Sequence, residues 1–382
     1  MSSEQKKKIR VGIVGLSVAP GSWGQLAHLP RLSKSPNLEI VALCNSSVAN
    51  AERAIREFKL PPGTRAYDRY EDLANDPDVD LFVVSTRADT HYEIALHGIR
   101  AGKDTYVEWP LAVTTSQASE LTELARQKGI RTVIGLQARA SPVIRKLKAL
   151  VDSGALGEVH STNFHAALNL WQNNAVGSKY SFFMDRQVGA NLLTIYGGHI
   201  LDTILYTLGE LKPGSYTPLL ANIRRRMHRT NPDGSLTPEL FDKDTPDQIL
   251  LQGRLDRVPP AVLSLHIRAG DRFVGQPGAV WRIYGTKGEI VLEFPSGGIQ
   301  IAPPTSFRFS NSATGKVEDV QYDDVDPDAH EFAQLPPQGQ NVGRLYEAFA
   351  AAAADDDNGG YADFEAALRR HQLLDEFWAA GF

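Results

Sequence analysis

The residues with the clearest potential for binding chemistry follow the first apolar segment of the chain. Ile9 to Leu16 reads as a short strand ending in glycine, and a helix is expected after the turn-rich segment that follows. Backbone N–H groups at such a turn, and at the helix N-terminus, can hold the pyrophosphate of a dinucleotide. The glycine spacing departs from Gly-x-Gly-x-x-Gly, because Ser17 takes the second position and Gly21 and Gly24 come late. A plain tight turn between strand and helix is the competing interpretation.

The end of the second expected strand, Leu38–Cys44, gives a second test of cofactor binding. Sites that prefer NAD place an Asp or Glu there to bind the ribose hydroxyls. This chain has Asn45-Ser46-Ser47 instead, without a carboxylate to repel a 2′-phosphate, so NADP is permitted alongside NAD. In the competing interpretation the serines only cap the helix that is expected to begin near Ala49.

Other catalytic and metal-binding patterns are missing from the sequence. It contains no Walker loop and no Gly-x-Ser-x-Gly elbow. Its one cysteine, Cys44, excludes an intramolecular disulfide and a thiolate metal cluster. The histidines His160, His165, His228 and His266 lack the spacing of metal ligands, so no metal is expected. The net charge of −5 gives no basic field for nucleic acid or anionic membrane, and no apolar run approaches the roughly 18–20 residues of a membrane span.

Alternating strands and helices fill about the first 140 residues. The expected helices after the second strand lie at Ala49–Phe58, around Leu73, at His91–Ala101 and at Thr115–Lys128. The expected strands lie at Asp80–Ser85, Asp104–Val107 and Arg131–Leu136. This alternation implies right-handed βαβ crossovers and a parallel, doubly wound sheet. Residues 1–140 are therefore expected to form a Rossmann domain that binds NAD or NADP.

Longer segments with period-two alternation follow an amphipathic helix at Pro142–Ser153. They predict a large, mostly antiparallel open sheet with strands at Glu158–Ala167, Leu219–Arg226, Gln248–Leu255, Ala261–Arg268, Val280–Tyr284 and Glu289–Phe294. Helices are expected at Val188–Leu208, Asn341–Ala354 and Phe364–Ala379, and residues 323–340 read as a surface loop. The fold class is α/β, with an α+β C-terminal domain for substrate and oligomer contacts at 141–382. Its last helices are able to pack back on the first domain.

The segment from Ser85 to Pro110 carries a family resemblance. It runs through a strand, Ser85-Thr86, His91, an amphipathic helix, a second strand and Glu108-Trp109-Pro110. In this order it resembles the family of glucose–fructose oxidoreductase, inositol dehydrogenase and their relatives, the Gfo/Idh/MocA family. That family has an N-terminal Rossmann domain and a C-terminal α/β domain, whose open sheet forms the substrate site and often the oligomer interface.

Within the family, several stretches are similar to the fungal galactose-regulon repressor group, among them Leu136–Pro142 and Gly198-His199 with Asp202. The resemblance also implies which residues meet the cofactor. Glu108 matches a glutamate near the cofactor ribose and nicotinamide, and Gln137 and Arg139 match residues that line the cleft between the domains. The expected cofactor contacts are Gly15, Ser17, Gly21, Trp23, Asn45, Ser46, Ser85, Thr86, His91, Glu108, Trp109, Gln137 and Arg139.

Proton transfer is where the chain departs from the family. The family's Glu-Lys-Pro has become Glu108-Trp109-Pro110, and an indole is neither an acid nor a base near neutral pH. His199 matches the family's substrate histidine, although Ile195 stands where an acid usually precedes it. Tyr196 lies one helical turn earlier and Lys179 in the preceding loop, so these three are the expected catalytic residues. In the competing interpretations Trp109 fills or stacks in the vacated lysine space, and His199 is a core histidine.

The sequence is compatible with two functions. The first is an NAD(P)-dependent oxidoreductase for a sugar, a polyol or a related hydroxy or carbonyl compound, with His199 as the proton handler. The second is a non-catalytic dinucleotide-binding co-regulator that binds a protein partner. A homodimer or higher oligomer through the C-terminal sheet is expected in either case. A cytoplasmic location is expected, or a cytoplasmic and nuclear one if Lys6-Lys7-Lys8 acts as a weak import signal. The favoured interpretation of this lysine run is a solvated tail before the first strand.

Overall fold

The computed structural model describes residues 7–171, 175–231, 233–322, 325–352 and 360–381, and leaves the side chains of Ser178 and Lys179 undescribed. The N-terminal lysine run at Lys6 therefore lies partly outside the described residues. The chain divides into two compact units, the first formed by residues 1–140 with 328–371 and the second by residues 141–327 with 372–382. No helix in these described ranges is long and apolar enough to cross a membrane.

A six-stranded parallel sheet forms the centre of the first unit, in the order β3-β2-β1-β4-β5-β6. The strands are β1 (Ile9–Val14), β2 (Leu38–Cys44), β3 (Arg65–Tyr67), β4 (Leu81–Val84), β5 (Asp104–Val107) and β6 (Thr132–Ile134). This is the order of dinucleotide-binding sheets, in which the ligand binds beyond the carboxyl ends at the point where the order reverses. Here the reversal lies between β1 and β4. The predicted doubly wound parallel sheet is confirmed.

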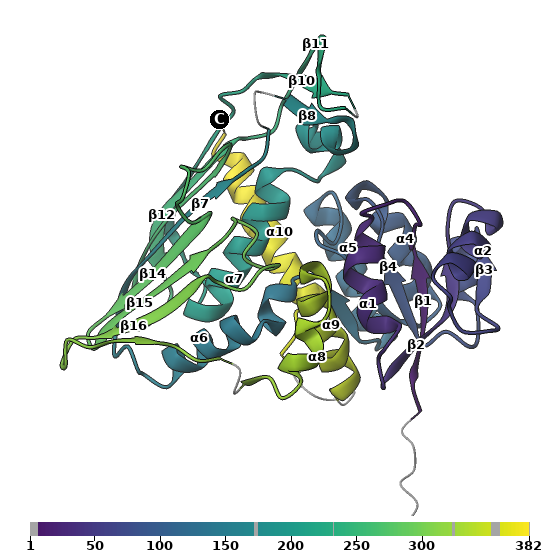
Figure 1. Ribbon diagram of the computed structural model, residues 1–382, viewed down its shortest axis with the longest axis horizontal. Helices are drawn as coiled ribbons and strands as arrows, with labels where there is room; N and C mark the ends of the chain where they lie inside the picture. Colours follow the sequence, from purple (N-terminus) through teal and green to yellow (C-terminus); the bar gives the residue numbers. More distant parts are fainter. Residues whose placement is uncertain (1–6, 172–174, 232, 323–324, 353–359, 382) are drawn as a thin grey trace, which may run out of the picture. The chain divides into compact units, whose positions relative to one another are not determined.

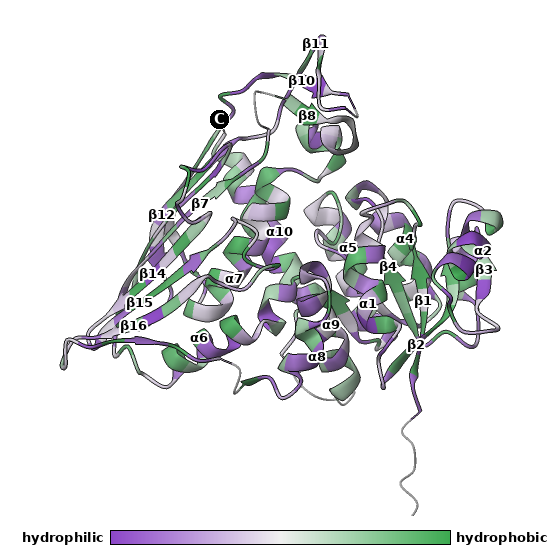
Figure 2. Ribbon diagram, in the orientation of Figure 1, coloured by the Kyte–Doolittle hydropathy of each residue, from purple (hydrophilic) through white to green (hydrophobic). Residues whose placement is uncertain are grey.

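Helices connect these strands and bury the central ones on both faces. They are η1 (Gly24–His28), α1 (Leu29–Leu32), α2 (Val48–Glu57), α3 (Tyr70–Ala74), α4 (Ala88–Arg100) and α5 (Thr115–Lys128). Burial on both faces explains why β1 and β4 are almost continuously hydrophobic (Figure 2). Helix α5 begins at a capping box between Thr114 and Gln117 and ends at Gly129, whose φ is +64°.

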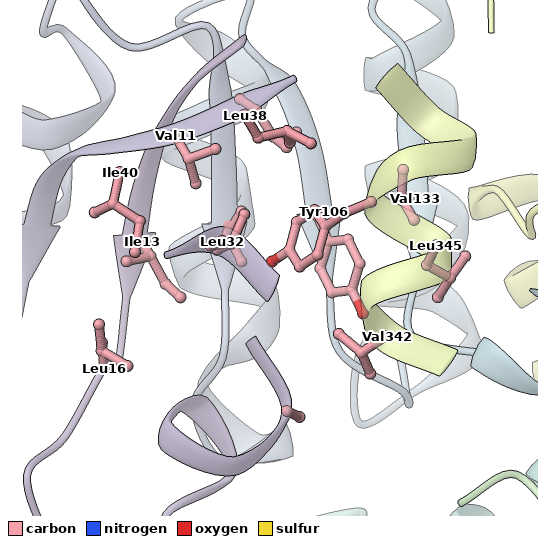
Figure 3. Close-up of a cluster of buried hydrophobic side chains, with 14 of the residues drawn as sticks. Val11, Ile13, Leu16, Leu32, Leu38, Ile40, Tyr106, Val133, Val342 and Leu345 are labelled. Carbon is pink, nitrogen blue, oxygen red and sulfur yellow. The ribbon is translucent and has the colours of Figure 1, made fainter. Parts of the chain in front are cut away.

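Segments from the end of the chain complete the core of the first unit. They are α8 (Ala329–Ala333), α9 (Pro337–Ala351) and the start of α10 (Phe364–Ala379). Val342 and Leu345 of α9 point into the cluster that contains Tyr106 and Val133 of the sheet (Figure 3). The expected surface loop at residues 323–340 is wrong over α8 and the first turn of α9, because Phe332 and other apolar side chains there are buried. Residues 323–324 of that loop lie outside the described chain.

A large sheet of eight strands, in the order β17-β16-β15-β14-β7-β13-β12-β9, dominates the second unit. The strands are β7 (Val159–Leu168), β9 (Leu211–Ala221), β12 (Gln248–Leu255), β13 (Val262–Ala269), β14 (Ala279–Gly285), β15 (Gly288–Phe294), β16 (Ser306–Asn311) and β17 (Val317–Asp319). Only the β7–β13 pair is parallel among these pairings, so the predicted mostly antiparallel sheet is confirmed. A smaller sheet contains β8 (Ala175–Gly177), β10 (Arg226–Thr230) and β11 (Leu236–Asp242).

One face of the large sheet is covered and the other is open. Helices α6 (Pro142–Asp152) and α7 (Gly198–Leu208) lie on the covered face (Figure 1). Side chains that point to this face, such as Phe164 and Trp281, are fully buried. Side chains that point to the opposite face, such as Val262 of β13 and Tyr284 of β14, are about half exposed, at 51% and 49%.

Two sequence expectations for the second unit were wrong in their bounds. The predicted strand Leu219–Arg226 is two elements, since β9 ends at Ala221 and β10 starts at Arg226. The predicted helix Val188–Leu208 begins four residues later, at Leu192 in the short helix η6 (Leu192–Gly197). Gly189 has a φ of +76°, and the Asn191 side chain accepts hydrogen bonds from the N–H groups of the first helical turn, so the helix cannot extend further back.

Candidate functional site

The glycine turn brings β1 against the end of β4. The N–H of Gly15 donates to the carbonyl of Cys44 at 3.0 Å, and its φ is +95°. A Cβ on Gly15 would lie 2.3 Å from the carbonyl oxygen of Ser85, so no side chain fits there. A Cβ on Gly24 would lie 3.2 Å from the Gly15 carbonyl, which matches the close helix–strand approach of dinucleotide sites. The late glycine therefore performs the packing role of the third glycine in the usual spacing.

The other expected residues of this turn shape it through local hydrogen bonds. Ser17 accepts a bond from the N–H of Ala19 at 3.1 Å, and its carbonyl accepts one from the Ser22 hydroxyl at 2.8 Å. Gly21 has a φ of +71°, which an L side chain adopts only with strain. Trp23 is the residue before helix η1 and is half buried. The turn thus leads directly into the N-terminus of a helix, a position that can bind an anion.

The end of β2 is polar and carries no carboxylate of its own. The Asn45 side chain donates to the Leu16 carbonyl at 3.0 Å and so ties this end to the glycine turn. The Ser46 hydroxyl accepts from Asn50 and is exposed, while Ser47 caps α2 through the N–H of Asn50 at 3.2 Å. A negative charge is nevertheless close by. Asp68 follows β3, and burial, followed by the charges of Asp68 and Asp72, raises the pKa of the Cys44 thiol to about 12.

His91 holds the loops after β4 and β5 together. Its Nδ1 lies 2.7 Å from the Pro110 carbonyl oxygen and its Nε2 lies 3.1 Å from the Thr86 carbonyl oxygen. Burial lowers the pKa of this imidazole. The Thr86 hydroxyl accepts from Thr90 at 2.8 Å. With both ring nitrogens on backbone carbonyls, His91 sets the shape of the loops that follow the two strands.

Glu108 lies in a buried polar network within the first unit. Its Oε1 is 3.0 Å from His28 Nε2 and accepts from the Tyr106 hydroxyl at 2.9 Å. Burial alone would raise the pKa of Glu108, but the contacts with His28, followed by those with Trp23 and Tyr106, together outweigh it and the pKa is lowered. The His28 Nδ1 lies 2.6 Å from the Tyr346 hydroxyl of α9. Sequence reasoning missed His28 and Tyr346, because their partners are distant in the chain.

Gly135 leaves the space that Glu108 fills. A Cβ there would lie 2.5 Å from Glu108 Oε2 and 3.0 Å from the backbone nitrogen of Trp109. The loops after β5 and β6 are therefore in contact. Gln137 and Arg139 follow in the short helix η2 (Gln137–Ala140), where Gln137 is 1% exposed.

Trp109 packs against a histidine that the sequence analysis did not select. Its indole is 4% exposed, and its ring centroid lies 5.1 Å from that of His371 in α10. The Trp109–Pro110 peptide bond is cis. Burial lowers the pKa of His371 to about 4, so this imidazole is neutral near pH 7. No sequence signal marked His371, because it lies more than 200 positions after Trp109 in an ordinary amphipathic helix.

The catalytic candidates His199 and Tyr196 lie in the second unit, on adjoining helices. His199 is in the first turn of α7 and is 6% exposed. Tyr196 is in η6, with its ring centroid 6.5 Å from that of Phe183, and burial, followed by the nearby Tyr180, raises its pKa. Tyr196 is therefore a neutral phenol that can donate a proton or a hydrogen bond near pH 7. The side chain of Lys179 lies outside the described part of the chain.

The residues at the ends of the parallel strands can be compared with what a bound dinucleotide requires. The Ser85 hydroxyl and Gln137 Oε1 are buried and have no hydrogen-bond partner among the described residues. Buried polar groups are normally paired, so these atoms suit a polar ligand. With Gly15 and Gly24 opening the turn to backbone N–H groups, the residues fit a dinucleotide whose pyrophosphate lies at η1 and whose other half extends over β4, β5 and β6.

Comparisons with known proteins agree with this geometry. Residues 9–136 match the model of an oxidoreductase family with an NAD-binding Rossmann fold, and residues 142–294 match that of the Gal80p C-terminal domain. The chain is 35% identical over 306 residues to the dehydrogenase aclE of Aspergillus oryzae, covering 78% of this chain and 80% of that protein. The chain belongs to this NAD-binding oxidoreductase family, the Gfo/Idh/MocA family, and carries the Gal80p type of C-terminal domain.

Solved structures share the fold. A super-repressor mutant of Gal80p from Saccharomyces cerevisiae superposes with a TM-score of 0.84 at 23% identity, covering 98% of this chain and 96% of that one. Levoglucosan dehydrogenase in complex with NADH and L-sorbose superposes with a TM-score of 0.76 at 18% identity, again covering 98% and 96%. At such identities the likeness establishes the fold alone. The chain is also 28% identical over 307 residues to the galactose/lactose metabolism regulatory protein GAL80 of Kluyveromyces lactis, covering 78% of this chain and 66% of that protein, so its relatives include both dehydrogenases and regulators.

Proposed function

We propose that this protein is an NAD(P)-dependent oxidoreductase that acts on a sugar, a polyol or a related hydroxy or carbonyl compound. The observation that carries the proposal is the glycine turn, in which Gly15 leaves no room for a side chain, Gly24 packs closely against it, and the buried Ser85 hydroxyl has no hydrogen-bond partner among the described residues. The 35% identity to a dehydrogenase over 80% of its length supports an enzyme. The 31% identity over 151 residues to an inositol 2-dehydrogenase of Lactiplantibacillus plantarum supports a polyol-like substrate.

In this proposal the two units divide the work. The first unit binds the nicotinamide cofactor, which accepts a hydride from the carbinol carbon of the substrate when bound. The second unit handles the hydroxyl proton. Oxidation of an alcohol releases that proton, and His199 accepts it, because an imidazole exchanges protons near neutral pH. The neutral phenol of Tyr196 donates a hydrogen bond to the substrate oxygen, and Lys179 is a further candidate for that contact.

The test is a turnover assay on the purified protein. Wild-type protein is incubated with NAD+ or NADP+ and a panel of sugars and polyols, and in the reverse direction with NADH or NADPH and carbonyl compounds. Absorbance of the reduced cofactor is followed in each case. We expect turnover with at least one sugar-like compound. Binding of cofactor without turnover of any compound in the panel would contradict the enzyme assignment.

A second candidate is a regulator that binds a dinucleotide and a protein partner. Two observations favour it: Trp109 occupies the position of the family's lysine, and residues 142–294 match the Gal80p C-terminal domain. The same protein preparation separates the two functions. A regulator would bind cofactor, turn over no substrate, and change its affinity for a protein partner when the cofactor is present.

A further inference from the structure

Two buried polar atoms without hydrogen-bond partners in the described chain belong to residues near Trp109, namely His371, whose ring packs on the indole, and Gln137, which follows the segment that meets the Trp109 backbone. Among the described residues, neither Nε2 of His371 nor Oε1 of Gln137 has a hydrogen bond. Their residues are 6% and 1% exposed, so water does not easily serve either atom. A buried acceptor that stays unpaired destabilises the folded chain, so a native protein that keeps such atoms usually has a ligand for them.

These atoms belong to the part of the first unit that lies beyond β5 and β6. Trp109 follows β5, and its ring is 5.1 Å from that of His371. Gln137 follows β6, and the loop before it approaches the Trp109 backbone, since a Cβ on Gly135 would lie 3.0 Å from the Trp109 nitrogen. In this class of sheet the pyrophosphate lies at the reversal between β1 and β4, and the second half of the dinucleotide extends over the neighbouring strands. The nicotinamide is that second half.

The chemistry of the two atoms matches an amide. Gln137 Oε1 can only accept a hydrogen bond. His371 is neutral near pH 7 because burial lowers its pKa to about 4, and the Nε2 of a neutral imidazole accepts when the proton lies on Nδ1. A carboxamide presents two N–H donors from one nitrogen. A paired set of acceptors is therefore complementary to the carboxamide of nicotinamide.

We propose that His371 and Gln137 bind the nicotinamide carboxamide N–H groups, with the Trp109 indole packed against His371. Trp109 stands where the family has a lysine, and an indole cannot make the lysine's polar contact. His371 then supplies a polar contact to the cofactor instead. This inference rests on the proposed cofactor binding and assigns a role to a residue far from the family motifs. It also explains how a chain with an indole at position 109 can still orient the nicotinamide ring.

Calorimetric titration with three ligands tests the assignment. The first is NAD+. The second is 3-acetylpyridine adenine dinucleotide, in which a methyl group replaces the amide nitrogen. The third is ADP-ribose, which lacks the nicotinamide altogether. We expect wild-type protein to bind the acetylpyridine analogue about tenfold more weakly than NAD+, a difference of about 1.4 kcal/mol. His371→Leu should bind NAD+ up to about tenfold more weakly, bind ADP-ribose within about twofold of wild type, and prefer NAD+ over the analogue less than wild type does.

Two further variants guard against a purely structural effect. His371→Gln places an amide oxygen near the position of Nε2, so it should keep most of the preference for NAD+ over the analogue. Gln137→Met removes the other acceptor at similar volume and should lower that preference as His371→Leu does. Two results would overturn the inference. In the first, His371→Leu loses affinity for NAD+ and for ADP-ribose equally. In the second, the wild-type protein does not distinguish NAD+ from the analogue. Failure of wild type to bind any of the three ligands would instead overturn the cofactor assignment itself.

Discussion

Among single residues, His199 carries the largest chemical role in the proposed reaction. His199→Ala should lower turnover by at least ~10²-fold, the low end of general acid–base contributions, and leave cofactor affinity nearly unchanged. The measurement is steady-state kinetics with the substrate found in the panel assay, with cofactor affinity determined separately. The exposed His160 on β7 provides a control in the same unit, and His160→Ala should retain full turnover. If His199→Ala is as fast as wild type, proton transfer belongs to Tyr196 or Lys179.

Glu108 is expected to contribute to stability through its buried contacts. Glu108→Gln removes the charge that faces His28 and weakens the bond from Tyr106, which should cost about 1–3 kcal/mol of unfolding free energy at pH 7. The folded-state pKa of Glu108 lies below its unfolded value, so its contribution is present above the unfolded pKa of about 4.3 and is lost as the pH falls through the folded pKa. Urea unfolding of both proteins at pH 7 and pH 4 measures this.

The difference between wild type and Glu108→Gln should shrink at the lower pH. A matched control is Glu123→Gln on the surface of α5, where the partner Arg126 is also exposed. That variant should unfold like wild type at pH 7. A Glu108→Gln protein as stable as wild type at pH 7 would mean that the network adds no net stability.

At the scale of elements, the end of β2 determines the choice between NAD and NADP. No carboxylate follows directly in Asn45-Ser46-Ser47, so NADP(H) should bind within about tenfold of NAD(H), a gap below about 1.4 kcal/mol. Competition titration with both cofactors measures this. A thousandfold preference for NAD(H) would contradict it and would point to Asp68 beyond β3, whose charge reaches the end of β2. Asp68→Asn should then relax that preference.

Sequence periodicity predicted long, regular elements well and local chain reversals poorly. The strand Gln248–Leu255 and the helix Thr115–Lys128 have the predicted bounds, since the first alternates and the second has a capping box. The predicted start of the helix at Val188 was wrong. The positive φ of Gly189 and the side-chain cap at Asn191 delay the start of the helix, although the preceding residues are partly apolar. Short strands such as β3 and β17, of three residues each, carry too little pattern to be seen.

The candidate site was predictable only where a local motif marks it. Gly15 stands out because a strand, a glycine and a helix follow one another in the sequence. His28 and His371 carry no such mark, since their partners Glu108 and Trp109 are 80 or more positions away and the contacts depend on the tertiary fold. Asp68 was missed for a related reason, because β3 was not recognised as a neighbour of β2. The roles of the catalytic candidates remain predictions.

At the scale of the whole molecule, the open face of the large sheet predicts self-association. Leu219, Val262 and Tyr284 are each about half exposed there, at 53%, 51% and 49%, and they come from different strands. A second copy that covers this face would bury them. We expect a homodimer or a higher oligomer at micromolar concentration by analytical ultracentrifugation. Val262→Glu should shift it towards monomer, because the charge would be buried without a partner.

A control variant separates the sheet face from exposed apolar residues elsewhere. Val274 is 91% exposed in the loop between β13 and β14, and Val274→Glu should leave the oligomer unchanged. A wild-type protein that sediments as a monomer would contradict the prediction. Equal effects of both variants would mean that the association does not depend on the sheet face.

Dinucleotide binding at the turn that begins with Gly15 is the property on which the other proposals depend. Calorimetric titration with NADH tests this binding directly. Wild-type protein should bind NADH saturably, and Gly15→Ala should bind at least about tenfold more weakly, because the new Cβ would meet the Ser85 carbonyl at 2.3 Å. Gly63→Ala is the matched control, since its φ is +92° but nothing lies within 4 Å of the added Cβ. That variant should bind NADH like wild type. No saturable binding of NADH or NADPH to wild type at millimolar concentration would contradict the account.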